Sequence, residues 1–350
     1  MIKYNPVTGE SGNCFVVGRG AIAIRLALSA IPTCRGKVIV PANICYAAVL
    51  PIIYAGLEPS FCDVDPVSGN VTFKMVEQSL QIDTVAAIIP HMYGNPVYGF
   101  LQIAELLKSR GVLLIEDCAS LMAIDGEHYT PGTIGDYVIY STGYSKTVDI
   151  GIGGLLFSKE NNLREMEITE KKFHPYKSEY ENTWNDFSGL YRKLRNIGER
   201  TLEAKRVFAY LPELFRDSFH FSVDDAIRRR VIESMTSLDG VIQERRRQCR
   251  LYRELLDMRA ERQYTYYADA VPWRFNMYVG DERKEFIEWC LNHRLPVSDW
   301  YPLVTPIFDD DGFFPGAEEH GKHIINFPLM IPDERIIEIC KAINDYYKGV

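Results

Sequence analysis

Residues 113–120 have the sequence LLIEDCAS, an apolar run that ends in the acid Asp117. Apolar runs of this length, rich in Leu and Ile, are typical of buried strands. A second apolar run, DYVIYS (136–141), is followed by a loop that carries Lys146 and leads to a pair of glycines. These stretches predict two strands, with an acid at the end of one and a lysine in the loop that follows the next.

Predicted strands and helices alternate outward from this part of the chain. Strands are expected at 37–42, 59–65, 85–94, 112–118, 136–141 and 153–158, and helices at 21–31, 44–56, 71–81 and 99–111. The strands are rich in Val, Ile and Leu without a clean alternation of apolar and polar residues. This pattern indicates a mostly parallel sheet covered on both faces, and therefore an α/β fold.

The character of the sequence changes beyond residue 160. The following hundred residues are charged and have a helical pattern, and a compact mixture of strands and helices closes the chain. We therefore expect a large domain at 1–250, which includes a divergent helical segment at 160–220. A small C-terminal α+β domain is expected at 251–350.

Composition limits the classes of function. The net charge is −8, from 47 acidic and 39 basic residues, which argues against bulk binding of nucleic acid. The eight cysteines are scattered without a CxxC pair or metal-ligand spacing, so no metal site is expected. We expect a reducing, cytoplasmic location. No signal peptide and no apolar stretch long enough to span a bilayer are recognised, so no membrane partner is expected.

Four polar side chains fall at or just after the ends of predicted strands. They are His91, Asp117, Ser141 and Lys146. Ligands of parallel α/β sheets bind at the carboxyl ends of the strands, so we expect these residues to share one site. Each also has a structural alternative: a core histidine bonded to backbone, a helix-capping acid, a satisfied strand-end hydroxyl and a surface lysine.

The pair Asp117 and Lys146 suits the chemistry of pyridoxal phosphate. A carboxylate can hold the pyridine nitrogen of this cofactor protonated, so that the ring accepts electrons, and a lysine can form the Schiff base. Gly18-Arg19-Gly20-Ala21 leads into a predicted helix, so the free backbone N–H groups, including those of Gly20 and Ala21, and the helix dipole can meet the cofactor phosphate. Ser141 can add a hydroxyl donor. Together these residues predict a pyridoxal phosphate site.

Longer motifs carry a family resemblance. They are VIVPANICYAAVLPIIYAGLEPSFCDVDP (38–66), PHMYGNP (90–96), IEDCAS (115–120), YSTGYSKTVDIGIGG (140–154), VSDWYPLV (297–304) and IINFPLMIPDERI (324–336). In this combination the chain resembles the DegT/DnrJ/EryC1/StrS family of pyridoxal phosphate-dependent sugar aminotransferases, which have the aspartate aminotransferase fold, fold type I. The resemblance runs from residue 15 to 345, and is strongest over 36–158 and weakest over 160–220.

The resemblance implies roles for single residues. Lys146 would form the Schiff base and move the proton, Asp117 would hold the pyridine nitrogen, and Ser141 would bind the phosphate. His91 and Tyr93 would lie beside the substrate. Tyr93 has packing as its structural alternative, as most tyrosines do.

The resemblance also implies an activity. It predicts transfer of an amino group from a donor, expected to be glutamate, to the ketone of a nucleotide-linked keto-deoxysugar, on a path to a polysaccharide or a glycosylated metabolite. Family members build each active site across a dimer interface, so a homodimer is expected. A diphosphate acceptor needs a cationic partner, for which Arg19, Arg274 and the basic run 192–206 are candidates.

Four positions depart from the family pattern. Ser120 stands where a glutamine usually contacts the phenolic oxygen of the cofactor, and Cys45 stands where an aromatic side chain often stacks on its ring. Both are still expected to touch the cofactor. Thr147 follows the lysine in place of an asparagine, and the asparagine of the partner subunit aligns loosely with His220. The departures indicate a divergent branch, so the keto acceptor and the position and stereochemistry of amination stay open.

Three alternatives compete with this hypothesis. A related sugar dehydratase carries histidine in place of the lysine, and Lys146 argues against it. A nicotinamide-binding enzyme needs GxGxxG after the first strand, and GRGAIA (18–23) lacks the third glycine. A non-catalytic protein that keeps the fold is disfavoured by the intact Asp117, Ser141 and Lys146.

Overall fold

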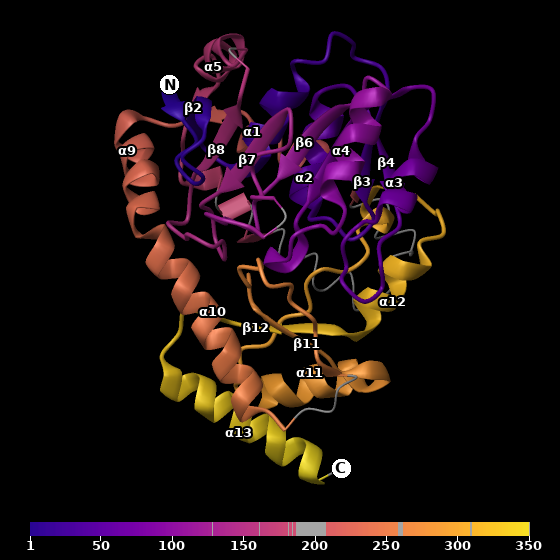
Figure 1. Cartoon of the computed structure of the whole chain (residues 1–350), viewed down its shortest axis with the longest axis vertical. Coiled ribbons are helices and arrows are strands. Elements are labelled where there is room, and N and C mark those ends of the chain that lie inside the picture. Colours follow the sequence, from indigo (N-terminus) through magenta and orange to yellow (C-terminus); the bar gives the residue numbers. More distant parts are fainter. Residues whose placement is uncertain are drawn as a thin grey trace.

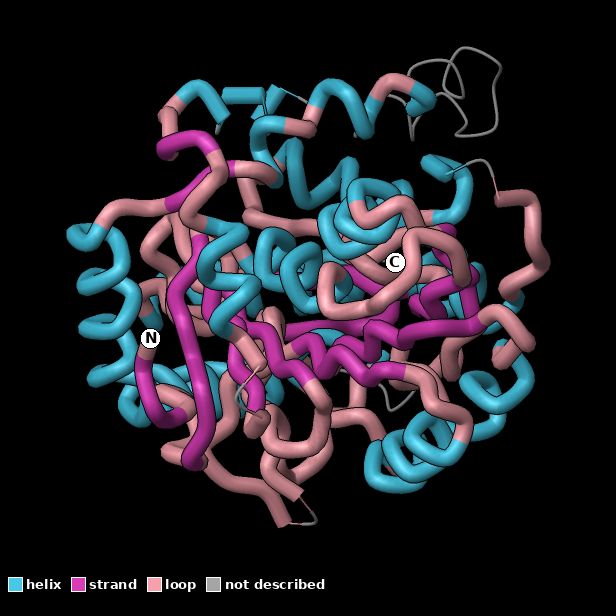
Figure 2. The backbone as a smooth tube through the Cα atoms, turned by 90° about the horizontal axis from the view of Figure 1, so that it is seen from above, coloured by secondary structure: helices cyan, strands magenta, loops and turns pink. Residues whose placement is uncertain are grey.

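The computed structural model describes residues 1–127, 129–160, 162–180, 182–183, 185–186, 208–257, 262–308 and 310–349. Within these residues one large sheet has eight strands, in the order β1-β2-β8-β7-β6-β5-β3-β4. The strands are β1 (Ile2–Tyr4), β2 (Ser11–Val17), β3 (Lys37–Pro41), β4 (Glu58–Cys62), β5 (Thr84–Pro90), β6 (Leu113–Asp117), β7 (Tyr137–Ser141) and β8 (Gly154–Ser158). Figure 2 shows strands in the middle of the molecule with helices around them.

Most of the sheet is parallel. Strands β4, β3, β5, β6 and β7 run parallel to one another. Strands β8, β2 and β1 follow at one edge, each antiparallel to the strand before it. The predicted strands from β3 to β8 are present, and the α/β fold with a large mixed sheet is confirmed. The prediction lacked β1 and β2. Of these, β1 has only three residues. Strand β2 starts with the polar stretch Ser11-Gly12-Asn13, so its apolar part is too short to predict a strand.

Four helices alternate with strands β2 to β6. They are α1 (Gly20–Leu28), α2 (Tyr46–Tyr54), α3 (Phe73–Ser79) and α4 (Phe100–Ser109). Each is shorter than its predicted range, because caps and turns fix the helix ends. The Thr72 side chain accepts a hydrogen bond from the backbone N–H of Met75 at the start of α3. Gly111 adopts a left-handed conformation, with φ at 67°, just after α4.

The divergent segment after β8 is described in part. Its elements are α5 (Arg164–Glu170), β9 (His174–Pro175), α8 (Leu211–Leu214), the 3-10 turn η2 (Asp217–Phe219) and β10 (Phe221–Ser222). Strands β9 and β10 pair in parallel, which the predicted helical pattern did not include. Phe221 lies so close to Gly18 that a Cβ on Gly18 would overlap the phenyl ring. The basic run 192–206 lies outside the described residues.

The C-terminal part combines a long helical run with a small sheet. Its elements are α9 (Asp225–Ser234), α10 (Leu238–Leu255), β11 (Phe275–Tyr278), α11 (Arg283–Asn292), α12 (Pro315–His323), β12 (Ile324–Phe327) and α13 (Asp333–Gly349). Helices α9 and α10 descend along one side of the molecule to its lower end, where α11 and α13 lie (Figure 1). Strands β11 and β12 pair antiparallel. No helix within the described ranges is long and apolar enough to cross a bilayer.

The predicted boundary at residue 250 falls inside α10. Ile242, near the start of this helix, packs in a hydrophobic cluster with strand residues of the large sheet. Tyr252, near its end, packs in a separate cluster with Phe275 of β11. One helix thus contributes to both cores, and the division at residue 250 stays a prediction.

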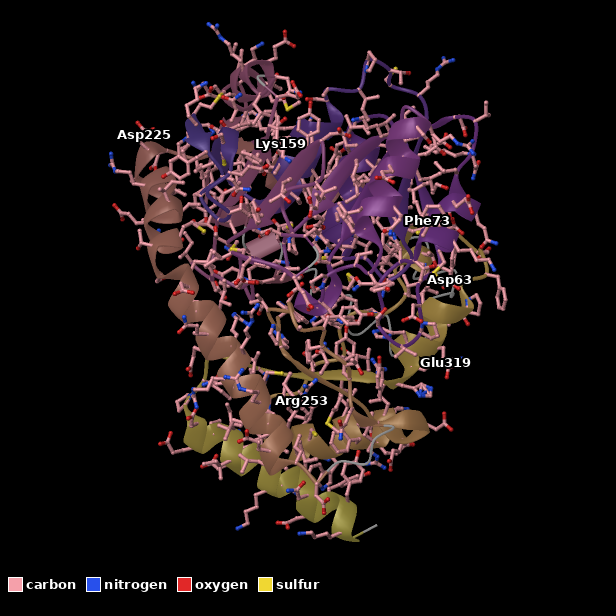
Figure 3. All side chains as sticks on the ribbon, viewed as in Figure 1. Asp63, Phe73, Lys159, Asp225, Arg253 and Glu319 are labelled. Atoms are coloured by element: carbon pink, nitrogen blue, oxygen red, sulfur yellow. The ribbon has the colours of Figure 1, made fainter. Side chains whose placement is uncertain are left out.

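A later stretch of the C-terminal part returns to the large sheet. Asp63, just after β4, accepts hydrogen bonds from the backbone N–H groups of Gly316 (2.9 Å) and Ala317 (2.8 Å) at the start of α12. Figure 3 labels Asp63 beside this helix. A carboxylate at a helix N-terminus satisfies free N–H groups and complements the helix dipole. The contact fastens the C-terminal part to the edge of the sheet.

Candidate active site

A cavity of about 340 Å³ lies at the carboxyl ends of β6 and β7. It is lined by all the residues predicted to bind the cofactor and by two of the predicted substrate residues. These are Gly20, Ala21, Cys45, Asp117, Ser120, Ser141 and Lys146, with Arg19 and Arg274. The structure therefore brings together residues that are up to 255 positions apart in the chain.

Asp117 is the last residue of β6 and is buried. The backbone N–H of Ala119 donates to its Oδ1 at 2.8 Å. Burial raises the pKa of the Asp117 carboxyl, and the nearby charge of Lys146 opposes this shift. A protonated ring nitrogen placed against this carboxylate would supply the missing charge partner. The surroundings of Asp117 fit the role that the sequence predicts for it.

Glu116, the preceding residue of β6, lies on the other face of the sheet. Its carboxylate accepts hydrogen bonds from the backbone N–H groups at positions 132, 134 and 135 and from Nε2 of His91, at 2.6 to 3.1 Å. Burial alone would raise the pKa of Glu116, but His91 and the backbone donors hold it below its usual range. This carboxylate is fully satisfied and structural.

The structure corrects the placement of His91. This side chain is fully buried and does not line the cavity. Its Nε2 faces Glu116 at 3.1 Å, and its Nδ1 accepts a hydrogen bond from the backbone N–H of Val97 at 3.2 Å. With both ring nitrogens used inside the fold, His91 is the core histidine of the structural alternative. The cluster of His91, Glu116 and Cys118 is close enough to hold a metal, but these hydrogen bonds already occupy its nitrogen and oxygen ligand atoms.

Tyr93 is also placed behind the cavity rather than in it. Its hydroxyl accepts a hydrogen bond from the backbone N–H of Tyr301 (2.9 Å) and lies 3.0 Å from Nε2 of His320. Burial lowers the pKa of His320 to about 4, so its ring is neutral. The Tyr93 carbonyl accepts from the N–H of Trp273 at 2.9 Å. Tyr93 thus supports two residues that line the cavity, which corrects its predicted contact with substrate.

One end of the cavity suits a phosphate. Gly20 and Ala21 are the first residues of α1, and the N-cap residue Arg19 makes no capping bond with its side chain. A Cβ on Gly20 would lie 3.0 Å from the Cβ of Ser141, so the serine is directly beside the helix N-terminus. Helix N-terminal N–H groups and a neighbouring hydroxyl are common partners of phosphate oxygens.

Lys146 lies in a loop whose side chains hydrogen-bond to the backbone of the same loop. Asp149 accepts hydrogen bonds from the backbone N–H groups of Ser145 (2.7 Å) and Gly151 (3.0 Å), and Thr142 donates to the carbonyl of Ile152 at 2.7 Å. The residues 141–153, named the lysine loop below, are therefore held in one shape.

The glycines at the end of the lysine loop and the start of β8, Gly153 and Gly154, allow a close approach to α1. A Cβ on Gly154 would lie 2.6 Å from the backbone carbon of Arg19, and the N–H of Gly153 donates to the carbonyl of Gly18 at 2.8 Å. The glycine pair therefore lets the lysine loop and the N-terminus of α1 meet in one cavity.

An aromatic wall, which the sequence analysis missed, closes another side of the cavity. Trp273, Trp300 and Tyr301 line it from the C-terminal part. The rings of Trp273 and Tyr301 stack with their centroids 5.4 Å apart and their planes at 28°. The sequences VPWRF and SDWYP held a signal only in their aromatic residues. Which cavity they reach is decided by contacts distant in sequence.

Ser120 and Cys45, the two departures predicted to touch the cofactor, both line the cavity. Ser120 lies close to the hydroxyl of Tyr301 in the aromatic wall, where it opposes the rise that burial gives to the pKa of Tyr301. Burial raises the pKa of the Cys45 thiol, against the nearby charge of Lys146, so Cys45 packs as a small neutral side chain. Cys45 therefore fills this side of the cavity less than an aromatic side chain would. Asn185 of the divergent segment also lines the cavity and was not predicted.

Arg274 is held in place beside Lys146. Its guanidinium stacks on the Trp273 ring at 4.7 Å and donates to the hydroxyls of Ser298 (2.7 Å) and Ser145 (3.1 Å). Burial lowers its pKa, and within the described ranges no carboxylate forms an ion pair with it. His220, by contrast, packs against Tyr54 and does not line the cavity of its own chain.

The mixed sheet, the acid at the end of β6 and the lysine loop after β7 define an enzyme of the fold type I pyridoxal phosphate class. The sequence pattern of the DegT/DnrJ/EryC1/StrS aminotransferase family matches residues 7–205, and the chain belongs to this family. It is a pyridoxal phosphate-dependent aminotransferase, and the resemblance and cofactor predicted from the sequence are confirmed.

Similar proteins cover nearly the whole chain. It is 32% identical to a GDP-perosamine synthase of Vibrio cholerae over 95% of this chain and 86% of that protein. It is 28% identical to a GDP-perosamine synthase of Escherichia coli O157:H7 over 95% of this chain and 85% of that protein. Its fold resembles that of the aminotransferase TlmJ from Streptoalloteichus hindustanus, with a TM-score of 0.78, 18% identity and coverage of 98% and 88% of the two chains.

Proposed function

We propose that this aminotransferase moves an amino group from glutamate to the ketone of a nucleotide-linked keto-deoxysugar. The single observation that carries the proposal is the cavity itself, where Lys146 and Asp117 lie with Arg274 and an aromatic wall. The two relatives named as GDP-perosamine synthases, which align over 95% of the chain, support the sugar class.

The residues of the cavity fit pyridoxal phosphate. Bound there, the cofactor would supply an electron sink for the negative charge that develops on the carbon bearing the transferred nitrogen. Lys146 would hold the cofactor and, once released, carry the proton as general base and then acid. Asp117 would keep the ring nitrogen protonated through a charge-assisted hydrogen bond. Gly20, Ala21 and Ser141 would bind the phosphate, and Ser120 and Cys45 would touch the ring.

The acceptor half of the proposal depends on cationic and aromatic groups. Arg274 has donors left over after its two serine contacts, and it lies in the cavity next to Trp273. A guanidinium in this setting can bind a phosphate or carboxylate in a fixed orientation. Arg19 lines the cavity near the N-terminus of α1 and is a second candidate. We assign the diphosphate contact to these two arginines.

A sugar dehydratase of the same fold remains the alternative activity within the cofactor class. That branch carries histidine where this chain has Lys146, and a lysine amine is the group that transamination needs. The presence of Lys146 in the cavity therefore favours the aminotransferase.

The function is tested by screening the aminated form of the enzyme against a panel of nucleotide keto-sugars. One or more of them should restore the visible absorbance of the lysine-bound cofactor and yield an amino sugar detectable by mass spectrometry. A matched panel of free keto-sugars without the nucleotide should react poorly. If simple keto acids turn over well and every nucleotide sugar fails, the proposed acceptor class is wrong.

We further propose that the protein is a cytoplasmic homodimer. All eight cysteines are free thiols, which suits a reducing compartment. The dimer is expected from the family's shared active sites, and light scattering at working concentrations should give about twice the mass of the 40.1 kDa chain. A fully active monomer would contradict it.

A further inference from the structure

Arg245 of α10 has a buried guanidinium that binds only backbone carbonyls within the described part of the chain. The residue is 6% exposed. Its Nη2 donates to the carbonyl of Lys146 (2.8 Å) and its Nε to that of Thr147 (3.2 Å). Its Nη1 donates to the carbonyls of Trp273 (2.8 Å) and Pro272 (3.3 Å). One side chain thus reaches four carbonyls in two segments more than a hundred residues apart.

The two segments lie on different sides of the cavity. Lys146 belongs to the lysine loop, and Trp273 belongs to the aromatic wall. A second link runs beside Arg245, because the Trp273 indole N–H donates to the carbonyl of Ser145. The distance between the lysine and the aromatic wall is therefore fixed at the backbone, behind the cavity.

A guanidinium is the side chain suited to this link. Burial lowers the pKa of Arg245 to about 10, with the charge of Arg274 adding to the shift, so the group is protonated at neutral pH. Its planar fork presents donors in several directions, whereas the ammonium of a lysine offers all of its donors from one atom. Within the described residues no carboxylate forms an ion pair with Arg245, so burying its charge carries a desolvation cost. An apolar side chain would avoid this cost if the position needed packing alone.

We propose that Arg245 is a positioning residue for catalysis, which holds the backbone of Lys146 in register with the aromatic wall. It contacts neither substrate nor cofactor and acts through the lysine loop. The proposal rests on the role proposed for Lys146. Without Arg245, the lysine should still form its bond to the cofactor, but its amine should be misplaced for proton transfer.

The test compares Arg245→Met with Arg246→Met in the full-length enzyme loaded with cofactor. Arg246, the next residue of α10, also donates to two backbone carbonyls, those of Ala270 (3.0 Å) and Asp269 (3.3 Å), but these lie away from the lysine loop. We expect Arg245→Met to lower kcat on the order of 100-fold with little change in KM, because small misplacements of a catalytic group have effects of this size. It should also lose cofactor faster than the wild type on dialysis, followed by visible absorbance. Arg246→Met should keep the wild-type kcat and rate of cofactor loss.

Arg245→Lys provides a second variant, which keeps the charge but can reach only one segment at a time. If Arg245→Met does not fold, the test rests on Arg245→Lys. The proposal is supported if kcat of Arg245→Lys falls by about tenfold or more while its melting temperature stays near that of the wild type. Wild-type kcat and cofactor retention in a folded Arg245 variant overturn it, as does an equal loss in the Arg246 control. The role proposed for Lys146 is tested separately. It is wrong if the wild-type enzyme itself lacks the absorbance of lysine-bound cofactor.

Discussion

Replacing Lys146 with alanine should lower the transamination rate by roughly 10⁴-fold or more, because one side chain is proposed both to hold the cofactor and to move the proton. The visible absorbance of the lysine-bound cofactor should disappear as well. The cofactor should still bind weakly, since the phosphate partners Gly20 and Ser141 remain. Absorbance spectra and single-turnover rates of the purified variant measure both effects.

Lys159 offers a matched control for this substitution. It lies just beyond β8, forms a surface ion pair with Glu10 at 2.8 Å, and is half exposed. Figure 3 labels Lys159 beside the large sheet, just past the end of β8. Lys159→Ala should keep the absorbance and the rate, because surface ion pairs contribute little to stability. If the absorbance of lysine-bound cofactor survives in Lys146→Ala, the assignment of Lys146 as the residue that holds the cofactor is wrong.

Asp117→Asn should keep the cofactor but lose turnover by roughly 100- to 1,000-fold, the range seen when one preorganised electrostatic contact of an active site is removed. The amide is nearly the same size as the carboxylate, so the cavity should keep its shape. It carries no charge to keep the ring nitrogen protonated, so the electron sink is weakened. Steady-state rates at matched cofactor occupancy test the role, and wild-type turnover would refute it.

Glu116→Gln is the neighbouring control on the same strand. The Glu116 carboxylate accepts hydrogen bonds from backbone N–H groups on the opposite face of the sheet. The amide of glutamine has a single oxygen and cannot accept all of these bonds. This variant should lose about 1–3 kcal/mol of stability for each buried donor left unpaired. Its remaining folded enzyme should keep the cofactor spectrum. Thermal melting and absorbance therefore separate a structural carboxylate from a catalytic one only one residue apart.

Much of the fold and of the cofactor site could be predicted from local sequence. Asp117 and Ser141 end apolar strands and Lys146 follows the second of them, and parallel strands bring their carboxyl ends to one edge of the sheet. The same argument failed for His91, because the end of a strand does not fix the direction of the next side chain. His91 turns toward Glu116, whose carboxylate had no local signal of its own.

The aromatic wall and Arg245 could not be predicted in the same way. Trp273 is held beside the lysine loop by its backbone, whose N–H donates to the carbonyl of Tyr93 and whose carbonyl accepts from Arg245. These contacts join residues separated by 28 to 180 positions, so no window of sequence contains them. Arg245 stands among other arginines in QERRRQCR (243–250), where composition alone indicates a solvated helix face.

Most of the residues that line the cavity come from two parts of the chain, and this has an evolutionary consequence. The residues proposed to bind the cofactor come from 20–146, on or beside the parallel strands, whereas the aromatic wall and Arg274 come from residues 273–301. Mutations in the second stretch that leave the contacts of Trp273 with Arg245 and Ser145 intact can alter the shape offered to an acceptor while Lys146 and Asp117 keep their places. Such a chain can drift toward new sugars while its chemistry stays under purifying selection, which is how one scaffold comes to serve many biosynthetic pathways.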